Sequence, residues 1–316
     1  MLRTPLCGLL GIEAPIVCAP FGPWEQVDLA AAVAEAGGLG SLGTGLRTPA
    51  ELRAQWARLR ELTDRPFAVN HTMRPFSEEA FAATLEARPP AISFHLGVPA
   101  DLIERAHAAG ILWIQQVIDR RQAEAALAAG ADVLIAQGGE AGGHSGWVAT
   151  IVLVPEVVDV AGNVPVVAAG GIVDGRGLAA ALALGAQGVS MGTRFLASTE
   201  MGIADAWKRR IVEAEALDAV KVPNSDRVLP PYSRPGGVAE PRALRTPLVD
   251  QLREHPDWVD PRATGPRLRE SVLAGGGHEY LPFAGQSAGL IGEVLPAGEI
   301  VRRTVAQAEA ALAAVP

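Results

Sequence analysis

The sequence has only two cysteines, Cys7 and Cys18, among its 316 residues. Their spacing matches no metal-binding motif, and one pair cannot form the disulfide network typical of small secreted proteins. HxH, HExxH and CxxC spacings are also missing. We therefore expect no metal site, and two small core cysteines in a reducing, cytoplasmic environment.

An excess of positive charge is missing as well. The 27 Lys and Arg residues are outnumbered by 35 Asp and Glu residues, which gives a net charge of −8. This balance argues against nucleic acid and anionic membrane surfaces as partners. Apolar runs stay short of the roughly 18 residues that a membrane helix needs. Glu13 interrupts the first apolar stretch before it could serve as a secretory core.

Short, continuously apolar runs alternate with Ala-rich helical stretches along the first 200 residues, and 49% of the chain is apolar. Continuous apolar runs are typical of parallel strands covered by helices. Eight such strands at regular spacing predict an α/β fold of the (β/α)8 TIM-barrel type, with a doubly wound open sheet as the alternative. The predicted strands are 15–20, 38–43, 67–71, 91–97, 111–117, 132–138, 165–171 and 188–193.

The βα rhythm stops near Thr199. We predict a barrel over residues 1–202 and a helical and loop appendage over the barrel mouth at 203–285, of which 203–220 reads as helical. Residues 221–270 are rich in Pro, Arg and Asp, with an irregular segment at 222–237. A segment at 286–316 closes the barrel with an amphipathic helix. The alternative is that 203–285 is a surface excursion without a part in the site.

Active sites of this fold lie at the carboxyl ends of the strands. Two glycines follow the seventh predicted strand, and Gly192 and Thr193 follow the eighth. Loops after these two strands often bind phosphate, because glycine lets backbone N–H groups approach the oxygens and threonine adds a hydroxyl donor. The strand ends supply these candidate residues: Ala19, Pro20, Phe21, Asn70, His71, His95, Gly97, Gln115, Gln116, Gln137, Gly170, Gly171, Gly192 and Thr193.

Asn70 and Gln137 carry amides, which donate and accept hydrogen bonds at once. Such groups match the alternating N–H and C=O edge of a flavin ring, and with a phosphate site they predict FMN. Tight turns and satisfied loop backbone are the structural alternatives for these glycines and amides.

His144 lies in the Gly-rich stretch AQGGEAGGHSG, next to Gly142 and Gly143. Its ordinary pKa suits proton transfer near neutral pH, so it is the candidate catalytic residue. Glu140 in the same stretch is expected to anchor its own loop, with an acid–base role as the alternative. A structural role is expected for His107, His255 and His278.

The stretches AQGGEAGGHSG, PVVAAGGIVDGRGLAAALALGAQGVSMGTRF and AGQSAGLI resemble the nitronate monooxygenase family, once called 2-nitropropane dioxygenases. The resemblance spans most of the chain and is weakest at 203–280. It implies an FMN-dependent TIM barrel that oxidises alkyl nitronates, such as propionate 3-nitronate, with O2. The family's catalytic histidine matches His144, and its FMN contacts match Asn70, Gln137, Gly142, Gly171, Ser190, Met191, Gly192 and Thr193.

One position departs from the family pattern, because Phe21 stands where the family usually has methionine. This difference bears on the substrate more than on the cofactor. The competing hypotheses are an NAD(P)H-dependent flavin reductase of the same superfamily, either enoyl-ACP reductase-like or quinone reductase-like, and a flavin-binding protein with little catalysis. The enoyl-ACP reductases more typically carry glutamate where this chain has Gln137, which favours the monooxygenase.

Overall fold

A computed structural model describes residues 2–73, 75–229 and 239–314. Eight parallel strands form one sheet in the order β1-β9-β8-β6-β5-β4-β3-β2. The two end strands also meet, since Leu39 N donates to Ile16 O and Cys18 N donates to Leu39 O, both at 2.9 Å. The sheet thus closes into a barrel, with strands Ile16–Cys18 (β1), Gly40–Gly43 (β2), Phe67–Thr72 (β3), Ala91–His95 (β4), Leu112–Val117 (β5), Val133–Gln137 (β6), Val166–Ala169 (β8) and Gly188–Met191 (β9).

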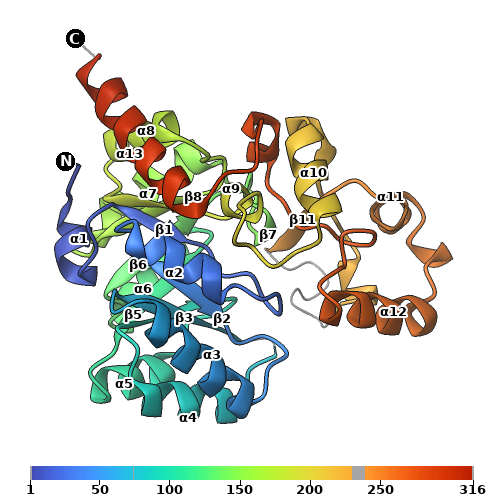
Figure 1. Cartoon of the computed structure of the whole chain (residues 1–316), viewed down its shortest axis with the longest axis horizontal. Coiled ribbons are helices and arrows are strands. Elements are labelled where there is room, and N and C mark those ends of the chain that lie inside the picture. The colour runs from blue at the N-terminus through green and yellow to red at the C-terminus, as the bar shows by residue number, and fades with distance from the viewer. Residues whose placement is uncertain (1, 74, 230–238, 315–316) are drawn as a thin grey trace.

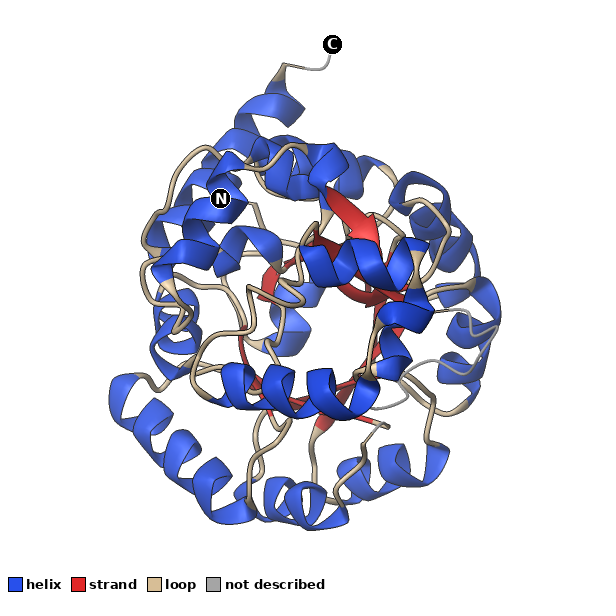
Figure 2. Ribbon diagram, turned by 90° about the vertical axis from the view of Figure 1, so that its right-hand side faces the viewer, coloured by secondary structure: helices blue, strands red, loops and turns tan. Residues whose placement is uncertain are grey.

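Helices surround the ring of strands, as Figure 2 shows when viewed along the barrel. Several begin at a side chain that accepts a backbone N–H of the first turn: Thr48 before α3, Ser77 before α4, Asp119 before α6 and Asp174 before α8. The helices of the barrel are Pro5–Leu10 (α1), Val27–Glu35 (α2), Pro49–Leu62 (α3), Glu78–Ala87 (α4), Ala100–Ala108 (α5), Arg120–Ala128 (α6), Thr150–Ala161 (α7), Gly175–Ala183 (α8) and Thr193–Leu196 (α9).

The predicted (β/α)8 architecture is confirmed, and each of the eight predicted strands has its counterpart in the sheet. Strand residues are buried on both faces of the sheet, because helices cover the outside and side chains fill the inside. The inward-facing Val17, Ile114 and Val167 cluster with Leu6 and Leu10 of α1. The short first helix therefore contributes to the packed interior of the barrel.

The described residues between 203 and 285, called the appendage below, lie on one side of the barrel and are drawn in yellow and orange in Figure 1. Its apolar cluster includes Val222, Val249 and Leu268. The helical reading of 203–220 holds only for Asp205–Glu213 (α10), since the chain then turns into a 3-10 helix and a strand. The other elements are Ala216–Asp218 (η1), Ala219–Lys221 (β10), Ser225–Arg227 (η2), Glu240–Leu244 (β11), Pro247–Glu254 (α11), Pro256–Trp258 (η3) and Pro261–Leu273 (α12).

The irregular stretch predicted at 222–237 is described only as far as Leu229, and its remaining residues lie outside the described part of the chain. After the appendage come a 3-10 helix, Gln286–Leu290 (η4), and the closing helix Ala297–Ala313 (α13). The predicted amphipathic C-terminal helix is therefore present, and it packs against α8 and α2. Among the described residues, no helix combines the length and the apolar character needed to cross a membrane.

A three-stranded antiparallel sheet joins the appendage to the barrel. Its strands are β10, β11 and Gly143–Ser145 (β7), which follows β6 in the chain. The glycine-rich stretch read from the sequence as a loop thus contains a short strand. Its partner β11 lies almost a hundred residues further along the chain, and that pairing leaves no periodic signal within three residues.

Candidate functional site

A cavity of about 680 Å³ opens where the barrel strands end and the appendage begins. A volume of this size is within the roughly 300–1,000 Å³ typical of small-molecule sites. Nearly all of the predicted site residues line it: Ala19, Pro20, Phe21, Asn70, Gln137, Gly142, Gly143, His144, Gly170, Gly171, Ser190, Gly192 and Thr193.

Met191 is the exception among the predicted cofactor-binding residues. Its side chain is buried in the main hydrophobic core, and the cavity wall does not include it. Successive side chains of a strand point to opposite faces, so Ser190 and Gly192 reach the cavity while Met191 faces the helices. Its place in the site is limited to the backbone, where Met191 O accepts a hydrogen bond from Ala19 N at 3.0 Å.

The same alternation separates the two glutamines of β5. Gln116 lines the cavity, and its Nε2 donates to Gln137 Oε1 at 2.9 Å. Gln115 points away, where its amide bonds Trp113 Nε1, Phe94 O and Gly97 O. The expectation that Gln115 reaches the barrel mouth is therefore wrong.

The ends of β8 and β9 form a small cradle of backbone. Gly170 and Gly171 have φ values of +102° and +72°, a region that strains side-chain-bearing residues. A Cβ on Gly170 would lie 3.0 Å from Thr150 Oγ1. Thr193 Oγ1 accepts Gly285 N at 2.8 Å, which leaves its own hydroxyl proton for another acceptor. The arrangement provides donors for an anion.

The cavity wall also includes the two predicted amides, Asn70 on β3 and Gln137 on β6, the strand next to β8. Asn70 is buried, and its Nδ2 donates to Ser93 O at 3.2 Å and contacts Ser93 Oγ at 3.0 Å. In the described part of the chain, these two contacts use the Asn70 nitrogen, and the hydrogen bond from Gln116 uses the Gln137 oxygen. The Asn70 oxygen and the Gln137 nitrogen are consequently left to face a ligand, one as acceptor and one as donor.

His144 lies on β7, between the appendage and the barrel mouth. Its ring contacts Phe283 edge to face, with centroids 6.0 Å apart. Burial, with smaller effects of the nearby His95 and Lys221, lowers the pKa of His144 to about 3. The imidazole is therefore neutral at physiological pH, with one nitrogen lone pair and one N–H.

The two other histidines of the cavity wall are also held neutral by burial. The pKa of His71 falls to about 3 and that of His95 to about 4. His71 Nε2 lies 2.9 Å from Thr84 Oγ1 and its Nδ1 lies 3.3 Å from Thr44 Oγ1, so both ring nitrogens have hydroxyl partners. This engagement fits a supporting role for His71.

Glu140 anchors its own loop, as the sequence suggested. Its carboxylate accepts Thr150 N at 3.1 and 3.0 Å, and Oε2 lies 2.8 Å from the Thr150 hydroxyl. Thr150 is the first residue of α7, so Glu140 satisfies free N–H groups at the start of that helix. An acid–base role would require breaking this cap.

The sequence did not identify the outer wall of the cavity. That wall comes from the appendage and the C-terminal segment. Their packing joins residues far apart in the sequence, and the only local pattern among the described wall residues is the i, i+4 pair Leu268 and Val272. His107, His255 and His278 do not line the cavity. The outer wall includes Trp207, Val228, Leu229, Gly265, Leu268, Arg269, Val272, Phe283, Ala284 and Ser287.

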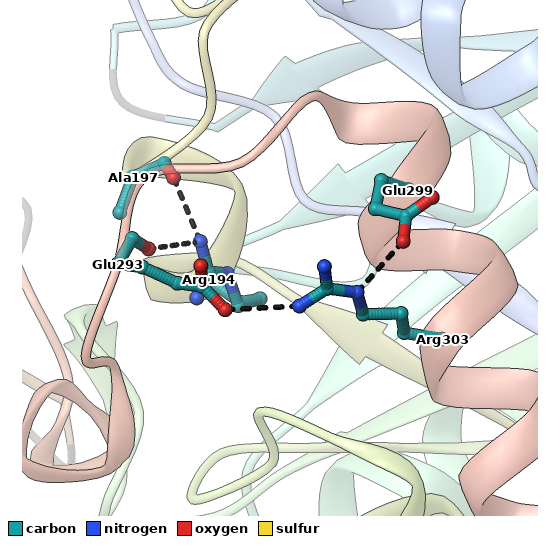
Figure 3. A network of polar contacts seen from close by, with 5 residues as sticks. All are labelled: Arg194, Ala197, Glu293, Glu299 and Arg303. Atoms are coloured by element: carbon teal, nitrogen blue, oxygen red, sulfur yellow. Dashed lines mark hydrogen bonds and ion pairs between the residues drawn. The ribbon is translucent and has the colours of Figure 1, made fainter.

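A polar network fixes the C-terminal segment beside the β9 cradle. Arg194 follows Thr193, and its Nη2 donates to Ala197 O at 2.8 Å and to Glu293 O at 2.7 Å (Figure 3). The Glu293 carboxylate in turn contacts Arg303 Nη1 at 2.9 Å. Within the described residues, no group of three or more His, Cys, Asp or Glu side chains could hold a metal ion.

The fold and the cavity together define a (β/α)8-barrel protein with a ligand site at the carboxyl ends of its strands. The family model for nitronate monooxygenase matches residues 3–84 and 75–307, and the chain belongs to this family of oxidoreductases. The family assignment made from the glycine-rich motifs is thereby confirmed, and the protein is an enzyme.

Relatives of two kinds are similar to the chain. A (3aS,4S,5R,7aS)-5-hydroxy-7a-methyl-1-oxo-octahydro-1H-indene-4-carboxyl-CoA dehydrogenase of Mycobacterium tuberculosis is 43% identical over 256 residues, which are 79% of this chain and 68% of that protein. The nitronate monooxygenase of Pseudomonas aeruginosa is 34% identical and covers 94% of this chain and 97% of its own length.

Solved structures show the same fold over the whole chain. FabK from Thermotoga maritima superposes with a TM-score of 0.89 at 36% identity, over 99% of this chain and 98% of that one. The nitroalkane oxidase of Streptomyces ansochromogenes has a TM-score of 0.82 at 31% identity, over 98% and 99%. The chain is therefore similar to proteins with different named activities.

Proposed function

We propose that the protein is an FMN-dependent enzyme that oxidises alkyl nitronates, such as propionate 3-nitronate, with O2 to a carbonyl compound and nitrite. The observation that carries the proposal is the cavity itself. It combines an anion cradle after β8 and β9, two ring-edge amides and the neutral His144 within one enclosed space. Its partners are then a small nitronate or nitroalkane and O2.

The residues present fit FMN. A Cβ on Gly142 would lie 2.6 Å from Ala284 C, so only glycine lets the two backbones pack this closely in the cavity wall. The phosphate would bind at Gly170, Gly171, Ser190, Gly192 and Thr193. Asn70 and Gln137 would meet the ring edge, with Ala19, Pro20, Phe21 and Gly143 alongside. Bound FMN would supply the redox chemistry, accepting electrons from the nitronate and returning them to O2.

His144 would act on the substrate directly. Its lone pair can take the α-proton of a neutral nitroalkane, and its N–H can donate to a nitro oxygen. A neutral ring suits the first role because the base form is already populated at pH 7. An anionic nitronate beside the ring would raise the pKa of His144 and strengthen its hydrogen bond.

The division of the chain follows from the same geometry. In this proposal residues 1–202 bind FMN, residues 203–285 shape the substrate end of the cavity and residues 286–316 close the barrel. The appendage supports this view because Trp207, Leu268, Val272 and Phe283 line the cavity.

A second candidate function acts on a larger substrate, as an NAD(P)H-dependent reductase or a carboxyl-CoA dehydrogenase would. The apolar outer wall favours a larger substrate, since a three-carbon nitronate offers little surface for the large side chains of Trp207 and Phe283. The 43% identical relative is named as a dehydrogenase of a fused-ring carboxyl-CoA. Both candidates use the same cofactor and the same histidine, so substrate tests decide between them.

The test is an absorbance spectrum of the purified protein under nitrogen, before and after separate additions of propionate 3-nitronate, NADH and NADPH. Flavin bands that bleach with nitronate and recover with O2, with nitrite formed, support the monooxygenase. Bleaching by NADH or NADPH alone moves the protein to the reductase alternative. A colourless protein that takes up no FMN would reject both.

A further inference from the structure

Lys221 of β10 is a buried cation next to the strand that bears His144. Its side chain is only 6% exposed, although it carries an ammonium group. Nζ lies within hydrogen-bond distance of four oxygens: Ser145 O at 2.7 Å, Ser145 Oγ at 2.7 Å, Gly146 O at 2.8 Å and Glu240 O at 3.0 Å. Three of the four belong to the two residues that directly follow His144.

The glycine-rich stretch is held to the appendage at both ends. His144 lies opposite Pro241 in the β7–β11 register, and the Pro241 backbone faces β10, since its O accepts Val222 N at 2.8 Å. Arg242 holds the other end of the glycine-rich stretch, with Nε and Nη2 donating to Gly139 O at 3.1 and 2.8 Å. Gly139 and Gly146 are therefore both tied to the appendage by cations.

We propose that Lys221 is a positioning residue for His144, whose ammonium clamps the Ser145–Gly146 backbone to the appendage and thereby fixes the imidazole in the cavity. This inference rests on the proposed role of His144 in nitronate oxidation. Gly142, Gly143 and Gly146 carry no side chains that could pack beside His144, so a charged clamp on three oxygens of the next two residues restrains the backbone there.

The charge of Lys221 also acts on the histidine. Burial lowers the pKa of Lys221 to about 8, and Arg242 lowers it further while Glu240 and Glu140 oppose this. The ammonium form still predominates at pH 7. Its charge disfavours a second positive charge on His144, which keeps the imidazole in the base form.

The test compares Lys221→Met with a matched control, Lys208→Met. Lys208 is also buried, at 7% exposed, and its Nζ donates to Thr199 O at 3.4 Å, but it lies on α10 and does not line the cavity. We expect Lys221→Met to keep FMN and to lose about 100-fold in kcat, as for a misplaced catalytic group. In Lys221→Ala, which leaves room for a small amine, methylammonium should restore part of the lost kcat by entering the vacated oxygen cage. Lys208→Met should keep kcat within about twofold of the wild type, since it holds no part of the site.

Unchanged kcat in Lys221→Met overturns the proposal, as does a loss that Lys208→Met reproduces. If Lys221→Met does not fold, Ser145→Ala removes one of the four oxygens, and an unchanged kcat in that variant also counts against the clamp. Titration of labelled histidine by NMR separates this inference from the proposed function. If the wild type fails to oxidise nitronate, the proposed function is wrong. A raised pKa of His144 in Lys221→Met would still support the effect of Lys221 on the histidine, and an unchanged pKa of His144 would reject that effect.

Discussion

At the scale of single residues, His144 is the position on which the chemistry depends. We expect His144→Ala to keep FMN, since the cradle and both amides remain, and to lose about 10²–10⁴-fold in kcat for a neutral nitroalkane. Stopped-flow bleaching under nitrogen measures this step. His255→Ala, an exposed histidine outside the cavity, is the control. Full turnover in His144→Ala would remove the imidazole from the mechanism.

Arg194 differs from the site residues because its contribution is structural. Its side chain is 6% exposed, and its Nη2 satisfies two carbonyls that have left water. We expect Arg194→Met to lower the free energy of unfolding by about 1–3 kcal/mol, the cost of leaving such groups unpaired. Urea unfolding checks this. Arg303→Met, which breaks half-exposed ion pairs, should lower stability much less than Arg194→Met, and an equal loss in both variants would contradict the argument.

The cavity residues at the strand ends could be predicted because each follows an apolar run, and the barrel fold brings all strand ends to one mouth. The side chains of Met191 and Gln115 point away from the cavity. The side chain of a strand residue faces either the cavity or the helices, and a one-residue error in register reverses the answer. Gln115 was assigned to the mouth from its position in the chain, without its place in the pleat.

At the scale of elements, the barrel strands and helices were predictable because their signals are local. Apolar runs, Ser77 and Asp119 as caps, and glycines after helices are all visible within a few residues. The β7–β11 pairing was not, because it joins segments far apart in sequence and His144 pairs with a proline. Strand β11 also pairs with β10, which bears Lys221. The strand that the sequence did not reveal is thus the one that brings Lys221 to the residues after His144.

For the whole molecule, burial of neutral histidines predicts destabilisation by acid. His71 is the firmest case, since its side chain is 2% exposed and burial lowers its pKa to about 3. An unfolded chain would protonate the same ring near pH 6.5. Below that pH the unfolded state binds a proton that the folded state does not, so stability present above about pH 6.5 is lost as the pH falls toward 3.

We therefore expect the free energy of unfolding to fall between pH 6.5 and 4. His71 alone contributes a slope of about 1.4 kcal/mol per pH unit in the lower part of this range, and His95 and His144 act in the same direction. Urea unfolding at several pH values measures the slope. His71→Gln should be less stable at pH 7 yet lose less stability on acidification, because one differential proton is gone. His255→Gln is the control. If His71→Gln and His255→Gln both keep the wild-type dependence of unfolding free energy on pH, His71 is not the group that couples folding to proton binding.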